Sequence, residues 1–190
     1  MANLTTIFLD RDGVINHKQP EDDYVTSWER FAFLPRVPEA IHLLNVAGLQ
    51  VIVVTNQRGI ARGRMREQDL QEIHHRMREE LALHEAQVEA IYSCPHDYGQ
   101  CDCRKPAIGL FQQAKKDFPE IDFPRAAIIG DSLSDLLPAH ELGCKAVLIA
   151  DAARRVKLLP EISEHGLVLY GIADSLYEWV VRYLATEEVL

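Results

Sequence analysis

Two aspartates separated by one residue are the first candidates for chemistry in this sequence. Asp10 and Asp12 directly follow the apolar run Thr6–Leu9, and Gly13 comes after them. A carboxylate can attack phosphorus to form an acyl phosphate, and a second carboxylate can protonate the leaving oxygen and later deprotonate water. Because Asp-Gly is also a common turn pair, this segment alone is equally compatible with a solvated turn.

Two further segments carry groups that could bind a phosphate. Thr55 and Asn56 follow the apolar run 51–54, and their hydroxyl and amide could donate hydrogen bonds to phosphate oxygens. Lys105 follows Arg104 and supplies a compact cation that suits a phosphate. Taken singly, a helix cap or a solvated lysine explains each of these groups better.

A second pair of aspartates, Asp131 and Asp135, follows the apolar run 126–129. Asp131 could complete a site for Mg²⁺ with Asp10, because this ion takes one or two carboxylates together with waters and substrate oxygens. Asp135 lies about one helical turn further on and could hold Lys105 in place. The alternative is a helix N-cap followed by a first-turn acid.

A short polar segment contains three cysteines and a histidine, namely Cys94, His96, Cys101 and Cys103. A Cys₃His set is typical of closed, tetrahedral, structural zinc sites. The alternative is a group of reduced cysteines, but cysteine is usually buried rather than clustered in a polar loop. We therefore predict a zinc-binding loop that fixes the basic segment after it, and we expect Cys144 to be a core residue.

These groups need a scaffold that brings strand ends together. Short apolar runs alternate with stretches of helical spacing. The predicted strands are residues 6–9, 51–54, 88–92, 126–129, 146–149 and 167–170. The predicted helices are residues 37–47, 67–86, 108–117, 133–142 and 176–184. This order predicts an α/β fold with a doubly wound, mostly parallel, Rossmann-like sheet and helices on both faces, which binds ligands beyond the carboxyl ends of its strands.

Composition and charge restrict the class of protein. The chain has 190 residues, of which 47% are hydrophobic and 26% charged, as expected for a single domain spanning residues 1–190. The net charge of −9 disfavours a nucleic-acid partner but not a small phosphorylated substrate. The N-terminal segment lacks a secretory signal pattern, and no stretch reaches the roughly twenty apolar residues that span a bilayer. We expect a cytoplasmic protein without a membrane partner.

Together, the four strand ends resemble the haloacid dehalogenase-like phosphatase superfamily over essentially the whole chain. The matching motifs are Asp-x-Asp, a Thr after the second strand, a Lys, and a Gly-Asp element with a further Asp. This resemblance implies that Asp10 is the nucleophile and Asp12 the general acid and base. It also implies that Thr55 and Lys105 bind the phosphoryl group.

The same resemblance implies a Mg²⁺ site made by Asp10, the backbone carbonyl of Asp12, and Asp131, with Asp135 in support. No insertion after the first or third predicted strand is long enough for a large cap domain. An open site suits a small substrate that reaches in with its phosphate.

Three segments narrow the resemblance: LDRDGVIN at residues 9–16, TNQRGIARG at residues 55–63, and the zinc-binding loop followed by CRKP. They resemble the D-glycero-D-manno-heptose-1,7-bisphosphate 7-phosphatase family, which implies a phosphorylated sugar substrate from lipopolysaccharide precursor biosynthesis. Arg58 stands where this family usually has a small Ser. Guanidinium groups suit phosphate, so Arg58, Arg62 and Arg104 could bind sugar hydroxyls or the distal phosphate, although exposed arginines are more often solvated.

Other functions remain open. Histidinol-phosphate phosphatases share the zinc-binding loop and the CRKP segment. A nucleic-acid 3′-phosphate is disfavoured by the acidic charge. A zinc-stabilised binding module has no need of Asp10, Asp12, Lys105 and Asp131 together, and a phosphomutase normally needs a lid, which the sequence does not show.

Overall fold

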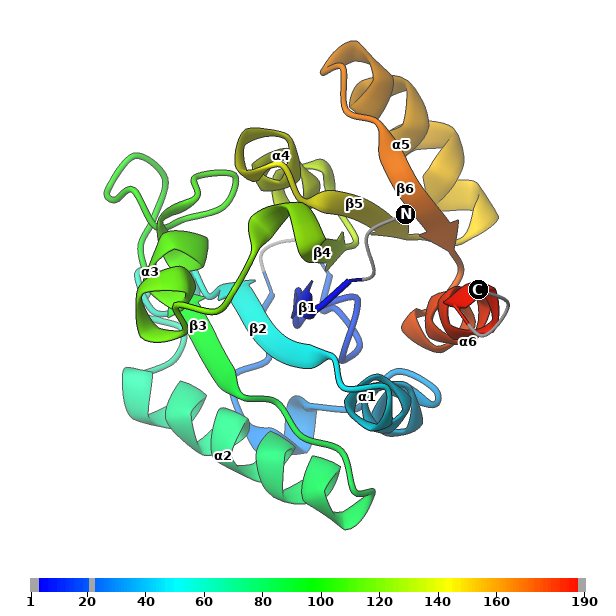
Figure 1. Ribbon diagram of the computed structural model, residues 1–190. Coiled ribbons are helices and arrows are strands. Elements are labelled where there is room, and N and C mark those ends of the chain that lie inside the picture. The colour runs from blue at the N-terminus through cyan, green and yellow to red at the C-terminus, as the bar shows by residue number, and fades with distance from the viewer. Residues whose placement is uncertain (1–3, 21–22, 188–190) are drawn as a thin grey trace.

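The computed structural model describes residues 4–20 and 23–187, and its centre is a six-stranded sheet (Figure 1). The strands are β1 (Thr6–Leu9), β2 (Gln50–Asn56), β3 (Ala90–Cys94), β4 (Ala126–Gly130), β5 (Lys145–Ile149) and β6 (Leu169–Ala173). They pair in the order β3-β2-β1-β4-β5-β6, and every pairing is parallel. The chain therefore winds outward in both directions from the central pair β1 and β4, which confirms the predicted doubly wound sheet.

Helices cover both faces of the sheet (Figure 1). One face carries α1 (Val37–Val46), α2 (Glu67–Leu83) and α6 (Leu176–Glu187). The other carries α3 (Gly109–Asp117), α4 (Leu133–Leu142) and α5 (Ala152–Glu164). Alternation along β1 supplies both layers, since Ile7 and Leu9 face the first and Phe8 faces the second. A buried core on each face thus holds the strand ends in place.

In the longest helix, α2, the spacing of apolar residues explains why the segment is helical. Leu70, Ile73, Met77 and Leu81 recur every three or four residues, and all four side chains are buried. The sequence predicts that this helix continues to residue 86, but it ends at Leu83. The following turn contains Glu85 with a left-handed φ of 53°, a conformation that ends a helix.

The bounds of the third and sixth strands differ slightly from the prediction. The third strand is Ala90–Cys94 rather than residues 88–92, and its register pairs Cys94 with Asn56. The sixth is Leu169–Ala173 rather than residues 167–170. The first shift places Cys94 inside the sheet, so the predicted zinc-binding loop is attached directly to β3.

Helix α5 is absent from the prediction. It contains Pro160, which disfavours a helix interior, although Leu158, Leu159 and Ile162 contact the core at helical spacing. Asp151 caps its start by accepting a hydrogen bond of 2.8 Å from the backbone N–H of Arg154. The helix therefore depends on a local cap and on packing against the sheet.

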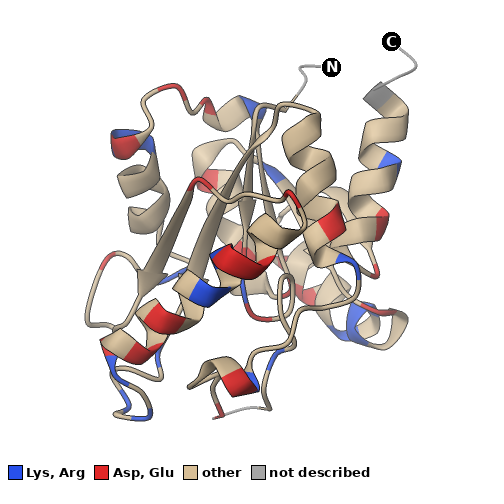
Figure 2. Cartoon of the chain, turned by 90° about the horizontal axis from the view of Figure 1, so that it is seen from below, with Lys and Arg blue, Asp and Glu red and all other residues tan. Residues whose placement is uncertain are grey.

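The described residues contain no separate cap domain after β1 or β3. In its described residues, the β1–α1 connection holds a short 3₁₀ helix, Trp28–Arg30, within loops. No helix in the described part of the chain is long and apolar enough to cross a membrane. Figure 2 shows the chain from below, with acidic and basic residues interspersed along the ribbon.

Candidate active site

The carboxyl ends of β1 and β4 bring three aspartates together. The backbone N–H of Asp10 donates to the Ile129 carbonyl at 2.9 Å, so this residue continues the β1–β4 ladder. Asp131 follows β4, and Asp135 lies in the first turn of α4. One carboxylate oxygen from each aspartate lies within 4.8 Å of the others, and all three side chains are buried. Such a set of hard oxygen donors fits Mg²⁺.

Two glycines allow this close approach. Gly13 has a φ of +100°, and a Cβ there would lie 2.3 Å from Asp131 Oδ2. A Cβ on Gly130 would lie 2.3 Å from the Cβ of Asp135. A side chain at either position would therefore displace an aspartate of the cluster.

Lys105 joins two of the aspartates. Its Nζ lies 2.7 Å from Asp10 Oδ1 and 2.8 Å from Asp135 Oδ1, and it donates to the Val54 carbonyl at 2.6 Å. Burial opposes the charge of Lys105, but the charges of Asp10 and Asp135 outweigh it and raise its pKa. Burial and the charge of Asp135 raise the pKa of Asp10 to about 7, against the opposing effect of Lys105.

Asn56 holds the backbone of Lys105. Its Nδ2 donates to the Lys105 carbonyl at 3.1 Å, and its Oδ1 accepts from the Lys105 N–H at 3.0 Å. The sequence predicts that this amide contacts the substrate. In the structure it bonds to the backbone of Lys105 and so positions the lysine. Asn56 also lines the cavity described below.

Four hydrogen bonds hold the carboxylate of Asp12. Arg11 Nη2 donates to both oxygens at 3.0 and 2.9 Å, Asn16 Nδ2 donates at 2.9 Å, and Gln57 Nε2 donates at 2.8 Å. Burial opposes ionisation of Asp12, but the charge of Arg11 and these hydrogen bonds outweigh it and lower its pKa. The same Gln57 nitrogen donates to Thr55 Oγ1 at 2.9 Å, so the buried threonine belongs to this network.

Two cations contact Asp131. Lys18 Nζ lies 3.0 Å from both carboxylate oxygens, and Arg154 Nη2 lies 2.8 Å from Oδ2. Burial and the charge of Asp135 raise the pKa of Asp131, while Lys18 and Arg154 oppose this effect. The two cations therefore help to keep this buried carboxylate ionised.

The predicted zinc ligands converge. The sulfurs of Cys94, Cys101 and Cys103 lie 3.2–3.5 Å apart, and His96 Nδ1 lies 3.3 Å from Cys103 Sγ and 3.6 Å from Cys94 Sγ. A tetrahedron with Zn–S distances of about 2.3 Å has edges of about 3.7 Å, so the donor set fits a closed zinc site. Cys144 is outside this group, and burial raises its pKa to about 12.

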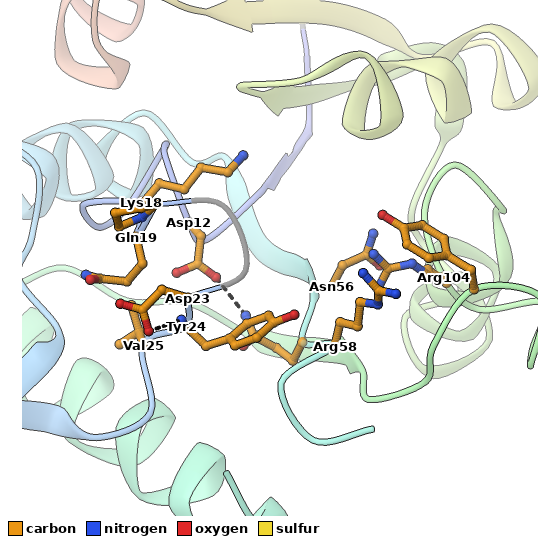
Figure 3. Close-up of a pocket in the computed structure, with 12 residues that line it drawn as sticks. Asp12, Lys18, Gln19, Asp23, Tyr24, Val25, Asn56, Arg58 and Arg104 are labelled. Atoms are coloured by element: carbon orange, nitrogen blue, oxygen red, sulfur yellow. Dashed lines mark hydrogen bonds between the residues drawn. The ribbon is translucent and has the colours of Figure 1, made fainter. Parts of the chain in front are cut away.

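A cavity of about 440 Å³ opens beside Asp12 (Figure 3). Arg58 and Arg104 lie at one end of it, opposite Lys18 at the other end. Each guanidinium contacts the ring of Tyr98, at 4.2 Å for Arg58 and 4.4 Å for Arg104. Among the described residues, none accepts a hydrogen bond from Arg104 Nε or Nη1, although both atoms are buried. Arg104 therefore lines the cavity and keeps two side-chain nitrogens without a hydrogen-bond acceptor among the described residues.

The other two arginines near this cavity are already paired. Arg58 Nε donates to Asp97 Oδ1 at 2.5 Å. Arg62 Nε lies 3.8 Å from Asp97 Oδ2, and Arg62 is not among the residues that line the cavity. Of the three predicted arginines, Arg104 is best placed to bind a ligand.

Two protein families match this chain. The family described as polynucleotide kinase 3 phosphatase matches residues 5–139, and the family described as HAD-hydrolase-like matches residues 102–178. The chain belongs to the haloacid dehalogenase-like (HAD-like) phosphatase superfamily. It is a phosphatase, as are the named relatives below.

Several proteins similar to this HAD-like phosphatase are named as heptose bisphosphate phosphatases. D-glycero-alpha-D-manno-heptose-1,7-bisphosphate 7-phosphatase of Mycobacterium bovis is 35% identical over 92% of this chain and 89% of its own length. D-glycero-beta-D-manno-heptose-1,7-bisphosphate 7-phosphatase of Pseudomonas aeruginosa is 41% identical over 90% of this chain and 97% of its own. The crystal structure of D,D-heptose 1,7-bisphosphate phosphatase from B. bronchiseptica, complexed with magnesium and phosphate, has a TM-score of 0.85 and 33% identity, covering 96% and 99% of the two chains.

Several residues at this HAD-like site are not among the sequence predictions, namely Arg11, Lys18, Gln57, His74 and Tyr98. Arg11 offers a signal, because a charged residue between two aspartates can pair with one of them, as it does with Asp12. Lys18 and Tyr98 lie in loops, where spacing does not predict direction. His74 and its neighbour His75 are the same residue type, so only packing distinguishes the partly buried ring from the exposed one.

Proposed function

We propose that this HAD-like phosphatase removes the 7-phosphate of D-glycero-D-manno-heptose 1,7-bisphosphate. The names of relatives that match about nine tenths of the chain support this substrate. The structural observation that carries the proposal is that Arg104 lines the cavity beside Asp12 and has two side-chain nitrogens without a hydrogen-bond acceptor among the described residues. They suit a second anionic group on a substrate whose first phosphate lies at Asp10.

In the proposed reaction, a carboxylate oxygen of Asp10 attacks the phosphorus and the bond to the sugar oxygen breaks. Asp12 enters this step in its protonated form, which its lowered pKa makes the stronger acid, and gives that proton to the sugar oxygen. The product alcohol leaves an aspartyl-phosphate behind. Asp12 then takes a proton from a water molecule that attacks the same phosphorus and restores Asp10. Lys105 neutralises phosphoryl charge while Asp135 holds it, and Thr55 donates a hydrogen bond to a phosphoryl oxygen.

The proposal includes two metal ions. Asp10, the backbone carbonyl of Asp12, and Asp131 would hold Mg²⁺, which when bound offsets the negative charge of the phosphoryl group. Cys94, His96, Cys101 and Cys103 would hold a structural Zn²⁺. The relative complexed with magnesium and phosphate supports the first ion, and the sulfur geometry supports the second.

Phosphate release by the purified protein with Mg²⁺ tests the substrate. The panel comprises both anomers of the heptose bisphosphate, histidinol phosphate, p-nitrophenyl phosphate and a 3′-phosphorylated oligonucleotide. Both anomers are needed because the relatives' names include alpha and beta forms, and the oligonucleotide is needed because of the matching family description. We expect the highest kcat/KM for one heptose anomer. A higher value for histidinol phosphate or the oligonucleotide would replace the proposed substrate.

A further inference from the structure

A series of hydrogen-bonded side chains connects α2 with Asp12. Arg11 is fully buried, and its Nη2 donates to both oxygens of Asp12 and to Gln57 Oε1 at 3.2 Å. On the other side, Arg11 Nη1 lies 3.1 Å from Nε2 of His74, which lies in α2. The general acid proposed above is thus linked to a helix on one face of the sheet.

The chemistry of this chain sets the state of His74. A guanidinium only donates hydrogen bonds, so His74 Nε2 must accept and its Nδ1 must carry the ring proton. Burial and the charge of Arg11 lower the pKa of His74 to about 3, so the ring is neutral at physiological pH. A neutral acceptor orients Arg11 without cancelling the positive charge that faces Asp12.

The same guanidinium sets the orientation of Gln57. Because Gln57 Oε1 accepts from Arg11, its Nε2 must face the opposite way, where it donates to Asp12 Oδ2 and Thr55 Oγ1. Asp12 remains 22% exposed and lines the cavity, so its carboxylate is restrained from behind while open to a ligand in front.

We propose that Arg11 and His74 are positioning residues, in which His74 aims Arg11 and Arg11 aims the carboxylate of Asp12. Neither side chain lines the cavity. The inference rests on the proposed role of Asp12 as general acid. A displaced acid delivers its proton poorly, and errors of about 1 Å in such groups cost about a hundredfold in rate.

The dependence of kcat/KM on the leaving group distinguishes a positioning role from a merely structural one. Benzyl phosphate and p-nitrophenyl phosphate are similar in size, but the benzyl alkoxide needs a proton to leave, whereas p-nitrophenolate does not. For His74→Leu, we expect kcat/KM to fall by about tenfold on benzyl phosphate and by less than about twofold on p-nitrophenyl phosphate. Arg11→Lys should act in the same direction, because an ammonium lacks the planar fork that reaches Asp12, Gln57 and His74 together.

The chain offers a matched control in His75. It follows His74 in α2 but is 67% exposed and lies 3.4 Å from Glu79, so His75→Leu should leave both rates unchanged. His74→Gln keeps a carbonyl acceptor and should restore most of the benzyl phosphate rate. This variant also provides the comparison if His74→Leu lowers the amount of folded protein, which thermal unfolding measures.

Asp12→Asn provides the reference for comparing the losses of kcat/KM on benzyl phosphate and on p-nitrophenyl phosphate. If it penalises benzyl phosphate selectively while neither His74→Leu nor Arg11→Lys does so, the inference is overturned and the proposed role of Asp12 stands. If Asp12→Asn affects both substrates equally, the proposed role of Asp12 fails and the inference fails with it. A selective loss in all three variants, with His75→Leu unchanged, supports the positioning role.

Discussion

At the scale of single residues, Asp10 is held on one oxygen by Lys105 at 2.7 Å, beside the other two aspartates. Asp10→Asn keeps the shape of the side chain, but an amide is a poor nucleophile and a poor Mg²⁺ ligand. We expect turnover to fall at least about a thousandfold with an unchanged circular dichroism spectrum. Steady-state phosphate release measures this loss.

Asp122→Asn is a suitable control for that variant, since Asp122 is exposed and belongs neither to the aspartate cluster nor to the cavity lining. Beryllium fluoride should form a Mg²⁺-dependent adduct with the wild-type protein and not with Asp10→Asn. Substantial turnover in a clean Asp10→Asn preparation would contradict the covalent mechanism.

The raised pKa of Asp10 predicts how Mg²⁺ affinity depends on pH. Burial and Asp135 raise this pKa to about 7, so below that pH a proton occupies the carboxylate that the ion needs. The Mg²⁺ association constant should therefore rise about tenfold per pH unit up to about pH 7 and level off above it. Isothermal titration calorimetry on either side of this value measures the slope. Asp10→Asn should remove it, and a flat profile in the wild-type protein would contradict the assignment.

Arg104 carries the prediction for substrate choice. The loss of a charge-assisted hydrogen bond costs about 1.5–3 kcal/mol, so Arg104→Ala should lower kcat/KM for the heptose bisphosphate by about ten- to a hundredfold. p-Nitrophenyl phosphate has no second anion and should be affected much less. Arg66→Ala is the matched control, because Arg66 is 77% exposed, pairs with Asp69 and lies outside the cavity lining. Equal losses on both substrates would show that Arg104 only shapes its loop.

At the scale of elements, the zinc-binding loop joins β3 to the segment that carries Lys105. We predict one tightly held Zn²⁺ per chain, bound by Cys94, His96, Cys101 and Cys103, which elemental analysis after dialysis measures. Its removal should lower activity, because the loop would no longer fix the lysine. Soft thiolate ligands favour Zn²⁺, so Mg²⁺ should not restore activity.

Thiol alkylation measures the reactivity of the cysteines in the same loop. Burial opposes ionisation of Cys101, but hydrogen bonds from Cys103 and from backbone N–H groups outweigh it and lower its pKa to about 7. After chelation, Cys101 should therefore react first, while Cys144, with a pKa of about 12, should react last. A stable, fully active protein without zinc would contradict the structural role of the ion.

At the scale of the whole molecule, the two apolar layers on either face of the sheet hold the strand ends in register. Phe111 of α3 is fully buried and packs edge to face on Phe8 of β1, with ring centroids 5.2 Å apart. Phe111→Ala should lower the free energy of unfolding by about 3–5 kcal/mol. Leu83→Ala, at a position that is 78% exposed, should change it by less than about 0.5 kcal/mol. Urea denaturation measures both, and similar losses would place the core elsewhere.

The sequence by itself determined the parallel doubly wound sheet and the superfamily, because hydrophobic periodicity and short motifs are local properties of the chain. Each predicted strand and helix is present within three residues of its predicted bounds, and the strand ends carry the predicted polar groups. Helix α5 escaped prediction because Pro160 lies inside it, and proline disfavours a helix interior.

Only the tertiary structure decided which side chains meet. Lys105 and Asp10 are 95 residues apart in the chain, and Arg11 and His74 are 63 apart, so no local pattern specifies either contact. The packing of α2 on the sheet partly buries His74 and leaves His75 in solvent, although the two residues are chemically identical. The register of β2 with β3 likewise brings Asn56 to the zinc-binding loop and turns its amide toward the backbone of Lys105. These partners arise from the distances between elements that are remote in sequence, which only the folded core sets.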